Sequence, residues 1–465
     1  MDRLSLADLR AVDERVLPFN PYGFGGRLSP EDALEFQQHV IAQYELADEV
    51  ADGTRQRFEQ LRHVYRYGVL CYDLFTMVGD AALLAFEQAL RDRFIIFHEG
   101  AVSLRTKDGE VHVLQDVTDY GDFVERYKGL KGTRIQMGPG RSWTGFNGTL
   151  DGLYRWARRE GLLRGQRNRG REKAITDLRN MVAHPSSFHL HGPVEAARTL
   201  SNLAEVINRL WGQDTPGGRL YPAPVGRRAT AIAWNPATGS VSIGHAENLR
   251  TDTDEDGWQY VIVQAVFEPG TAEDPTIFHF DALFEHTTYP CDLLWGPGNR
   301  VEALKWLDSN PPTSDTCDHL DRVFLIRHDV ETLYTPQRPE VAAGLPEAEH
   351  SGTWYAMRAD APADAFAHVR ASVEDVESRH QPSGECRQCH ADTLRKGTLR
   401  EALTAAQEAG ANVEPIRPPD SRVPGWMPRS ITVAHHAGQR VPGSASLGPY
   451  VRLRSGDESS HRPSQ

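Results

Sequence analysis

The chain has 465 residues, a net charge of −13 and 39% hydrophobic residues, which is the composition of a globular protein with about two to four domains. It contains no apolar run near the ~20 residues of a membrane span, and its first residues lack the basic-then-apolar pattern of a signal peptide. Five cysteines, an odd number, do not suggest a disulfide framework. The sequence therefore predicts a cytoplasmic protein in a reducing compartment, with no membrane partner.

Basic residues are concentrated in one segment of this acidic chain. Up to Trp211 there are 28 Lys/Arg against 29 Asp/Glu, so the remainder carries about −12. From Arg126 to Arg179 there are 14 Lys/Arg against four Asp/Glu, a local net charge of +10. Such a segment attracts phosphate backbones, although a solvated helix face is the alternative interpretation.

The first part of the chain has helical periodicity. Ser29 and Pro30 are typical of a helix start, because serine caps free N–H groups and proline suits the first helical position. Apolar residues at helical spacing follow. They predict helices from Ser29 to about Tyr44, at about Thr54–Phe75, Asp80–Phe97, Leu150–Leu163 and Arg171–Ala183, and from Pro193 to Trp211.

Residues 100–148 interrupt this pattern. The apolar residues on either side of Lys107-Asp108-Gly109 predict a short hairpin. One or two helical turns are expected at Phe123–Tyr127, and a loop at Met137–Trp143. Residues 1–211 are therefore predicted to form an all-α bundle with a small β/loop insertion.

The second part is predicted to be an α+β domain, or two small ones, covering residues 229–415. A Gly/Pro-rich linker at 212–228 precedes it, and a Pro/Arg/Ser-rich, partly disordered tail at 416–465 follows it. The expected strands are Ala229–Trp234, Val241–Gly244, Tyr260–Phe267, Ile277–Phe280, Arg322–Ile326 and Trp354–Met357, and the expected helices are Val301–Leu307, Ala363–Val376 and Thr398–Ala409.

The most informative motif is Leu178-Arg-Asn-Met-Val-Ala-His-Pro185. On a continuous helix Arg179 and His184 would point about 140° apart. Proline pushes the residue before it out of helical geometry, so the helix should end near Ala183 and leave His184 free to turn back toward Arg179. An arginine fork for phosphate beside a histidine that moves protons near neutral pH could cleave RNA without a metal, and Asn180 adds donors and an acceptor. The candidate RNA-binding residues before the motif are Arg164, Arg167, Arg169, Arg171 and Lys173.

This motif resembles that of the HEPN superfamily, whose ribonucleases carry an arginine, a polar residue, and then a histidine four to six residues after the arginine. The predicted helix order over about residues 28–211 is similar as well. The resemblance implies that Arg179, Asn180 and His184 are catalytic and that no cofactor is required. It also implies a homodimer with two motifs in one composite site, and a role in bacterial antiviral defence, abortive infection or a toxin system.

The acidic second part would then sense a trigger, such as a regulatory or phage-derived protein, or inhibit the nuclease by competing with RNA for the basic segment. Deleting residues 229–465 should in that case raise activity. The main alternative is a non-catalytic HEPN module that dimerises and scaffolds a partner protein or binds a nucleotide.

Cys386-Arg-Gln-Cys389-His390 has the form of a c-type haem attachment site, but that attachment needs export, which the sequence does not indicate. Cys386 and Cys389 are also half of a zinc site. Cys317, His319 and Cys291 are the further ligands that the sequence offers. No second Cys-x-x-Cys completes the set, so two reduced thiols in a polar loop remain the alternative to a structural zinc.

Overall fold

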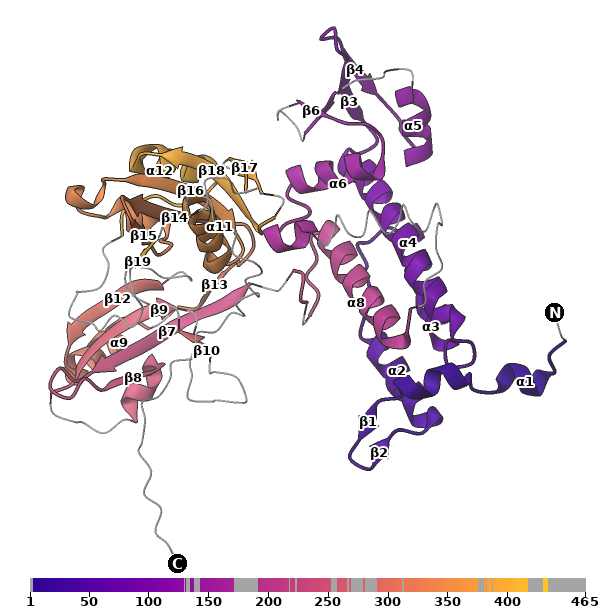
Figure 1. Cartoon of the computed structure of the whole chain (residues 1–465), viewed down its shortest axis with the longest axis horizontal. Helices are drawn as coiled ribbons and strands as arrows, with labels where there is room; N and C mark the ends of the chain where they lie inside the picture. The colour runs from indigo at the N-terminus through magenta and orange to yellow at the C-terminus, as the bar shows by residue number, and fades with distance from the viewer. Residues whose placement is uncertain are drawn as a thin grey trace, which may run out of the picture.

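The structure, a computed structural model, describes residues 3–433 with gaps. The residues it leaves undescribed are 1–2, 129, 131–133, 138–142, 171–190, 217, 222–223, 252–256, 266, 269–278, 281–290, 312, 375–379, 382, 387, 417–429 and 434–465. The described part forms two lobes, one mainly helical and one built around two larger sheets (Figure 1).

The long helix α4 (Asp73–Phe97) is the centre of the N-terminal lobe. It packs against α3, α6 and α8, and α2 packs on α3 and α8. The core between them contains the fully buried rings of Phe58, Phe75, Phe94 and Trp156. The bounds of the other elements are α1 Leu6–Arg10, a 3-10 helix Glu14–Phe19, β1 Tyr22–Gly23, β2 Gly26–Arg27, α2 Pro30–Ala42, α3 Asp52–Arg66, α6 Leu150–Arg159 and α8 Pro193–Leu210.

The predicted start of α2 is confirmed. The Ser29 hydroxyl accepts a hydrogen bond from the N–H of Asp32 at 3.2 Å, and Pro30 is the first helical residue. This is the N-cap geometry that favours serine before a helix.

The predicted boundary between the next two helices is wrong. α3 ends at Arg66 and α4 already begins at Asp73, whereas the sequence suggested one helix through Phe75. The turn passes through Gly68, where a Cβ would lie 2.3 Å from the ring of Phe75. Val69 and Phe75 enter the same core, so apolar spacing continues through the turn and hides the break from the sequence pattern.

The predicted hairpin in the insertion is confirmed, and Gly109 takes a φ of +89° in its turn. It belongs to a four-stranded sheet in the order β4-β3-β5-β6, and the two short strands β5 and β6 were not predicted. Most of the expected loop at Met137–Trp143 lies outside the described residues, and Trp143 already belongs to β6. The N-terminal lobe is therefore not purely helical. The bounds are β3 Val102–Arg105, β4 Val111–Leu114, α5 Tyr120–Lys128, β5 Arg134–Gln136 and β6 Trp143–Gly145.

The expected linker at 212–228 is largely structured. β7 begins at Val225, and the backbone N–H groups of residues 219–221 donate to the buried carboxylate of Glu205 on α8. β7 enters a five-stranded sheet in the order β12-β9-β7-β13, with β8 also paired to β7. The bounds are β7 Val225–Trp234, β8 Val241–His245, a 3-10 helix Ala246–Arg250, β9 Gln259–Ala265, β10 Phe267–Glu268, β11 His279–Phe280, β12 Cys291–Gly298, α9 Arg300–Ser309 and β13 Asp315–Cys317.

A six-stranded antiparallel sheet follows, in the order β17-β18-β16-β14-β15-β19. Alternate side chains of its central strands pack on α11 on one face and on α10 and α12 on the other. β19 pairs with β15, so the sheet extends past residue 415, into the segment where a partly disordered tail was expected. The bounds are β14 Arg322–Asp329, β15 Thr332–Tyr334, α10 Pro339–Ala343, a 3-10 helix Glu347–Glu349, β16 Thr353–Ala359, α11 Pro362–Glu374, β17 Gly384–Glu385, β18 Ala391–Gly397, α12 Leu399–Glu408 and β19 Ser430–Thr432.

Candidate functional site

The predicted catalytic residues Arg179, Asn180 and His184 lie outside the described residues, as do Arg171 and Lys173. The structure describes both flanks of this segment. Residues 166–170 are helical on one side. On the other side the N–H of His191 donates to the hydroxyl of Thr76 on α4 at 3.0 Å.

The remaining candidate RNA-binding residues form what we call the arginine stretch, Arg164, Arg167 and Arg169. All three bind carboxylates of the C-terminal lobe. Arg164 pairs with Asp318, and its Nε lies 3.6 Å from an oxygen of Asp321. The other two arginines form bidentate pairs, the geometry that makes arginine–carboxylate contacts strong. Arg167 bonds Asp364 at 2.7 and 3.2 Å, and Arg169 bonds Asp392 at 2.7 and 3.0 Å.

Arg169 is the most enclosed of the three, with 24% of its side chain exposed against 11% for Asp392. Glu385 adds a third oxygen 3.3 Å from the same guanidinium. Burial by itself lowers the pKa of Arg169, but the hydrogen bonds and charge of Asp392, with the charge of Glu385, outweigh it and raise that pKa above its usual value. The charged pair is therefore held together in a partly desolvated setting.

Asp360, the residue directly after β16, caps the helix that leads toward the undescribed segment. Its two carboxylate oxygens accept the N–H groups of Gln166 and Arg167, each at 2.9 Å. These are the first two helical residues, so the C-terminal lobe satisfies N–H groups that a helix start leaves open. Asp321 contributes further bonds to Gly165 and to the amide of Gln166.

The carboxylates that bind the arginine stretch and its backbone lie along one border of the six-stranded sheet, where β14 begins, β16 ends and β18 begins. We call this set the acidic edge. It consists of Asp318, Asp321, Asp360, Asp364, Glu385 and Asp392.

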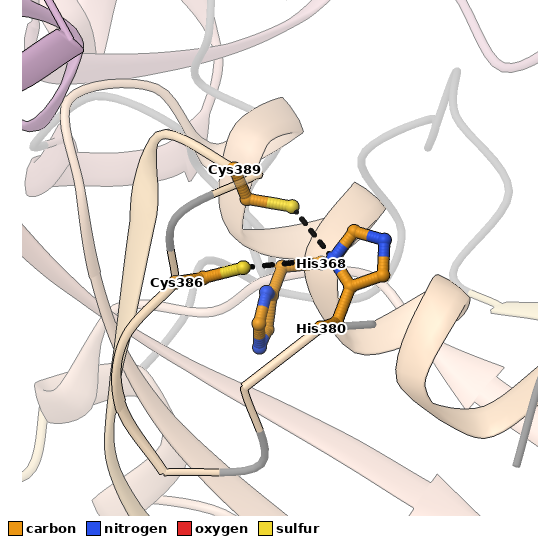
Figure 2. A group of neighbouring side chains, drawn as sticks. All are labelled: His368, His380, Cys386 and Cys389. Carbon is orange, nitrogen blue, oxygen red and sulfur yellow. Dashed lines mark hydrogen bonds between the residues drawn. The ribbon is translucent and has the colours of Figure 1, made fainter. Parts of the chain in front are cut away.

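A second group of side chains lies next to the acidic edge. His368 on α11, His380 in the following loop, and Cys386 and Cys389 in the loop between β17 and β18 place their ligand atoms within 4.8 Å of one another (Figure 2). Nδ1 of His380 lies 3.0 Å from Sγ of Cys389 and 3.6 Å from Sγ of Cys386. Two thiols and two imidazoles that converge in this way could hold a metal ion. We call them the Cys2His2 group.

The contacts of His368 fit this role. Its Nε2 forms a 3.1 Å hydrogen bond with the hydroxyl of Thr393 on β18. A histidine that ligates a metal commonly has its second nitrogen bonded in this way, which fixes the orientation of the ring.

Burial, and then the neighbouring His380, lower the pKa of His368 to about 4. Burial and Cys386 raise the pKa of the Cys389 thiol to about 12. These shifts disfavour charge at both residues when no metal is bound, whereas a bound cation stabilises the thiolate.

The structure brings together the two cysteines named from the sequence but gives them different partners. Cys317 and His319 lie outside the Cys2His2 group and contact each other, with Sγ and Nε2 3.9 Å apart. Cys291 begins β12. His368 was not predicted as a ligand because it sits in the helix α11, where a histidine in the sequence pattern carries no metal signal. His380, six residues before Cys386, was the detectable clue.

Comparison with protein families, curated proteins and solved structures gave no match. Among the helices that the structure describes, none combines the length and the apolar character needed to cross a membrane.

Proposed function

We propose that this chain is a metal-independent endoribonuclease of the HEPN type. The observation that carries the proposal is the motif Arg179-Asn180…His184-Pro185. Along the chain the motif follows the helical residues 166–170 and precedes α8, and the described residues on both flanks belong to a chain region that packs α3, α4 and α8 together. The order of a long helix pair, an insertion, the motif and a closing helix supports the same assignment.

In the proposed reaction the ribose 2′-oxygen attacks the adjacent phosphorus and the bond from phosphorus to the 5′-oxygen breaks. The products are a 2′,3′-cyclic phosphate and a 5′-hydroxyl. His184 would take the proton from the 2′-hydroxyl or give one to the leaving 5′-oxygen. Arg179 would stabilise the charge that develops on the phosphate oxygens, and Asn180 would orient the substrate. A defence or toxin role, and a homodimer that pairs two motifs, belong to this proposal.

The test is cleavage of an end-labelled RNA without added divalent metal and with EDTA, comparing the wild type with Arg179→Ala and His184→Ala. We expect each substitution to lower the rate by at least ~100-fold, the usual effect of losing a general acid–base or a charge-stabilising group. Matched controls are Arg57→Ala and His63→Ala, both at exposed positions of α3 and outside the basic segment. The zinc content of the EDTA-treated sample is measured in parallel. Cleavage that both active-site variants retain would refute the assignment.

We further propose that Zn²⁺ occupies the Cys2His2 group as a structural ion. Zinc takes two thiolates and two imidazoles in a tetrahedron, with bonds of about 2.0 to 2.3 Å that place ligand atoms roughly 3.3 to 3.8 Å apart. The distances of 3.0 and 3.6 Å between His380 and the two sulfurs are near that range.

Elemental analysis of the purified full-length chain should give one zinc per chain. Co²⁺ substitution should produce the absorption bands of a tetrahedral thiolate complex. Cys389→Ser should lose both signals and Cys71→Ser should keep them, because Cys71 is a free, exposed cysteine outside the group. A wild-type protein without bound metal would contradict the proposal.

A further inference from the structure

We propose that the Cys2His2 group is a metal-supported latch, which holds the acidic edge on the arginine stretch and thereby excludes RNA phosphates from these arginines, which precede the Arg179–His184 motif in the sequence. This inference rests on the proposed ribonuclease function for its biological meaning. The intramolecular contact itself rests on the distances given above.

Along the chain, the four metal ligands lie in two pairs between three residues of the acidic edge. Cys386 and Cys389 are bracketed by Glu385 and Asp392, the two acids that contact Arg169. His368 lies one helical turn after Asp364, the partner of Arg167, on α11. An ion bound by these ligands would fix the backbone on both sides of the acids that bind the two arginines.

The loop that carries the cysteines has few backbone hydrogen bonds to the sheet. β17 pairs with β18 through two residue pairs, Gly384 with Thr393 and Glu385 with Asp392, and the N–H of Cys386 donates to the carbonyl of Ala391 at 3.4 Å. The packing of α11 against the sheet core does not depend on this loop. A bound metal would therefore mainly fix the position of Glu385 and of the residues that follow it. One of these residues, His390, lies close to the arginine stretch, because a Cβ built on Gly170 would be 3.9 Å from its ring. Gly170 is the last described residue before the motif segment.

The acidic edge offers the arginine stretch negatively charged oxygen atoms, as the phosphates of an RNA backbone would. Asp364 and Asp392 each occupy one pair of guanidinium donors, on Arg167 and on Arg169, and such a fork also suits phosphate. These carboxylates neutralise the two arginines and take the forks that a phosphate would use, so RNA binds those forks only after it displaces the acids. The partner that competes with the latch is thus the phosphate backbone of an RNA.

The test measures binding of the full-length, zinc-loaded protein to a fluorescent 2′-O-methyl RNA oligonucleotide, which cannot be cleaved because it lacks the attacking hydroxyl. Asp364→Asn with Asp392→Asn removes two carboxylates and leaves the shape of the edge unchanged. We expect about tenfold tighter binding, and a steeper dependence on salt because two further phosphate contacts form. The charge-matched control is Glu247→Gln with Asp308→Asn, which removes two acids that pair with Arg250 away from this interface.

The metal arm uses the Cys389→Ser variant, with Cys71→Ser as its control. Cys389→Ser should tighten binding of the same probe severalfold, and should add nothing in the Asp364→Asn, Asp392→Asn background, because the latch is already open there. Circular dichroism checks that each variant keeps its secondary structure.

Unchanged affinity in the Asp364→Asn, Asp392→Asn protein would overturn the inference, even if Arg179 and His184 prove to be catalytic. Tighter binding without any cleavage of ordinary RNA would support the latch and refute the ribonuclease. Tightening equal to that of the control pair would show a net-charge effect and would also overturn the inference.

Discussion

The guanidinium of Arg169 and the carboxylate of Asp392 form a bidentate ion pair, at 2.7 and 3.0 Å, between residues 223 positions apart in the chain. Removing either partner leaves the other in a largely enclosed site. We expect Arg169→Ala to lower the free energy of unfolding by about 2 to 3 kcal/mol, less than the loss for a fully buried pair because 24% of the arginine side chain is exposed. Urea denaturation of both single variants and of the double variant gives the coupling energy, and we expect it to exceed about 1 kcal/mol. Additive single effects would argue against a functional pair.

Asp360 should protect the start of the helix that leads into the motif segment. Asp360→Ala removes the acceptor of the N–H groups of Gln166 and Arg167, and loss of such a cap costs about 1 kcal/mol. Hydrogen–deuterium exchange should accelerate at both amides and at the amide of Asp321, which shares the same carboxylate. Asp308→Ala, in an unrelated surface pair, is the control. Exchange that stays slow at all three amides in Asp360→Ala would contradict the assigned role.

Removing the metal should destabilise the C-terminal lobe. A ligand that binds only the folded state at a thousand times its Kd contributes about 4 kcal/mol, so excess chelator should lower the Tm by several degrees. In the Cys386→Ser protein the chelator should have no effect, because the site is already incomplete. Differential scanning fluorimetry measures both. An identical chelator response in the wild type and the variant would place the responsible metal elsewhere.

Stability should fall as the pH drops below about 6.5, in part through His98. This ring lies against Phe94 and Trp156, at 4.7 and 6.0 Å between centroids. Burial lowers its pKa to about 4, against about 6.5 in an unfolded chain. The unfolded state then binds the proton more readily, so the stabilisation is complete above pH 6.5 and is lost progressively between 6.5 and 4.

His98→Phe stays neutral and aromatic. It should therefore reduce the stability difference between pH 7 and pH 4.5 by about 2 to 3 kcal/mol, at 1.36 kcal/mol for each pH unit. Urea denaturation at the two pH values measures the difference. As a control, His63→Gln, at an exposed position, should leave this stability difference unchanged. An unchanged difference in His98→Phe would show that the His98 ring is solvated and would contradict the prediction.

Glu205 should be essential for the connection between the lobes. Its buried carboxylate accepts the N–H groups of Arg219, Leu220 and Tyr221 at 3.0, 2.6 and 2.5 Å. Glu205→Ala leaves these donors without a partner and should cost about 3 kcal/mol. Glu205→Gln keeps one acceptor oxygen and should cost less. Denaturation midpoints with unchanged slopes measure the effect, and equal costs for the two variants would point to lost packing instead.

Much of the secondary structure follows from the sequence alone. Apolar spacing predicted α2, α8, α9, α11 and α12, and the alternating strands β7, β9, β14 and β16, because their buried faces obey the periods of helix and strand. The start at Ser29 followed from local capping chemistry. The short strands β5, β6 and β17 were missed because pairs or triplets of residues carry no period, and their pairing is decided by neighbours far along the chain.

The sequence also determined which residues make up the candidate sites, namely the Arg179–His184 motif that we propose cleaves RNA, the basic segment before it and the cysteines at 386 and 389. Only the tertiary structure decided the partners. His368 and His380 complete the cysteine pair, and carboxylates of the second lobe take the arginines that the sequence had assigned to RNA. The physical reason is that ion pairs and metal ligands depend on distances of a few ångströms between side chains. Folding sets those distances independently of separation along the chain.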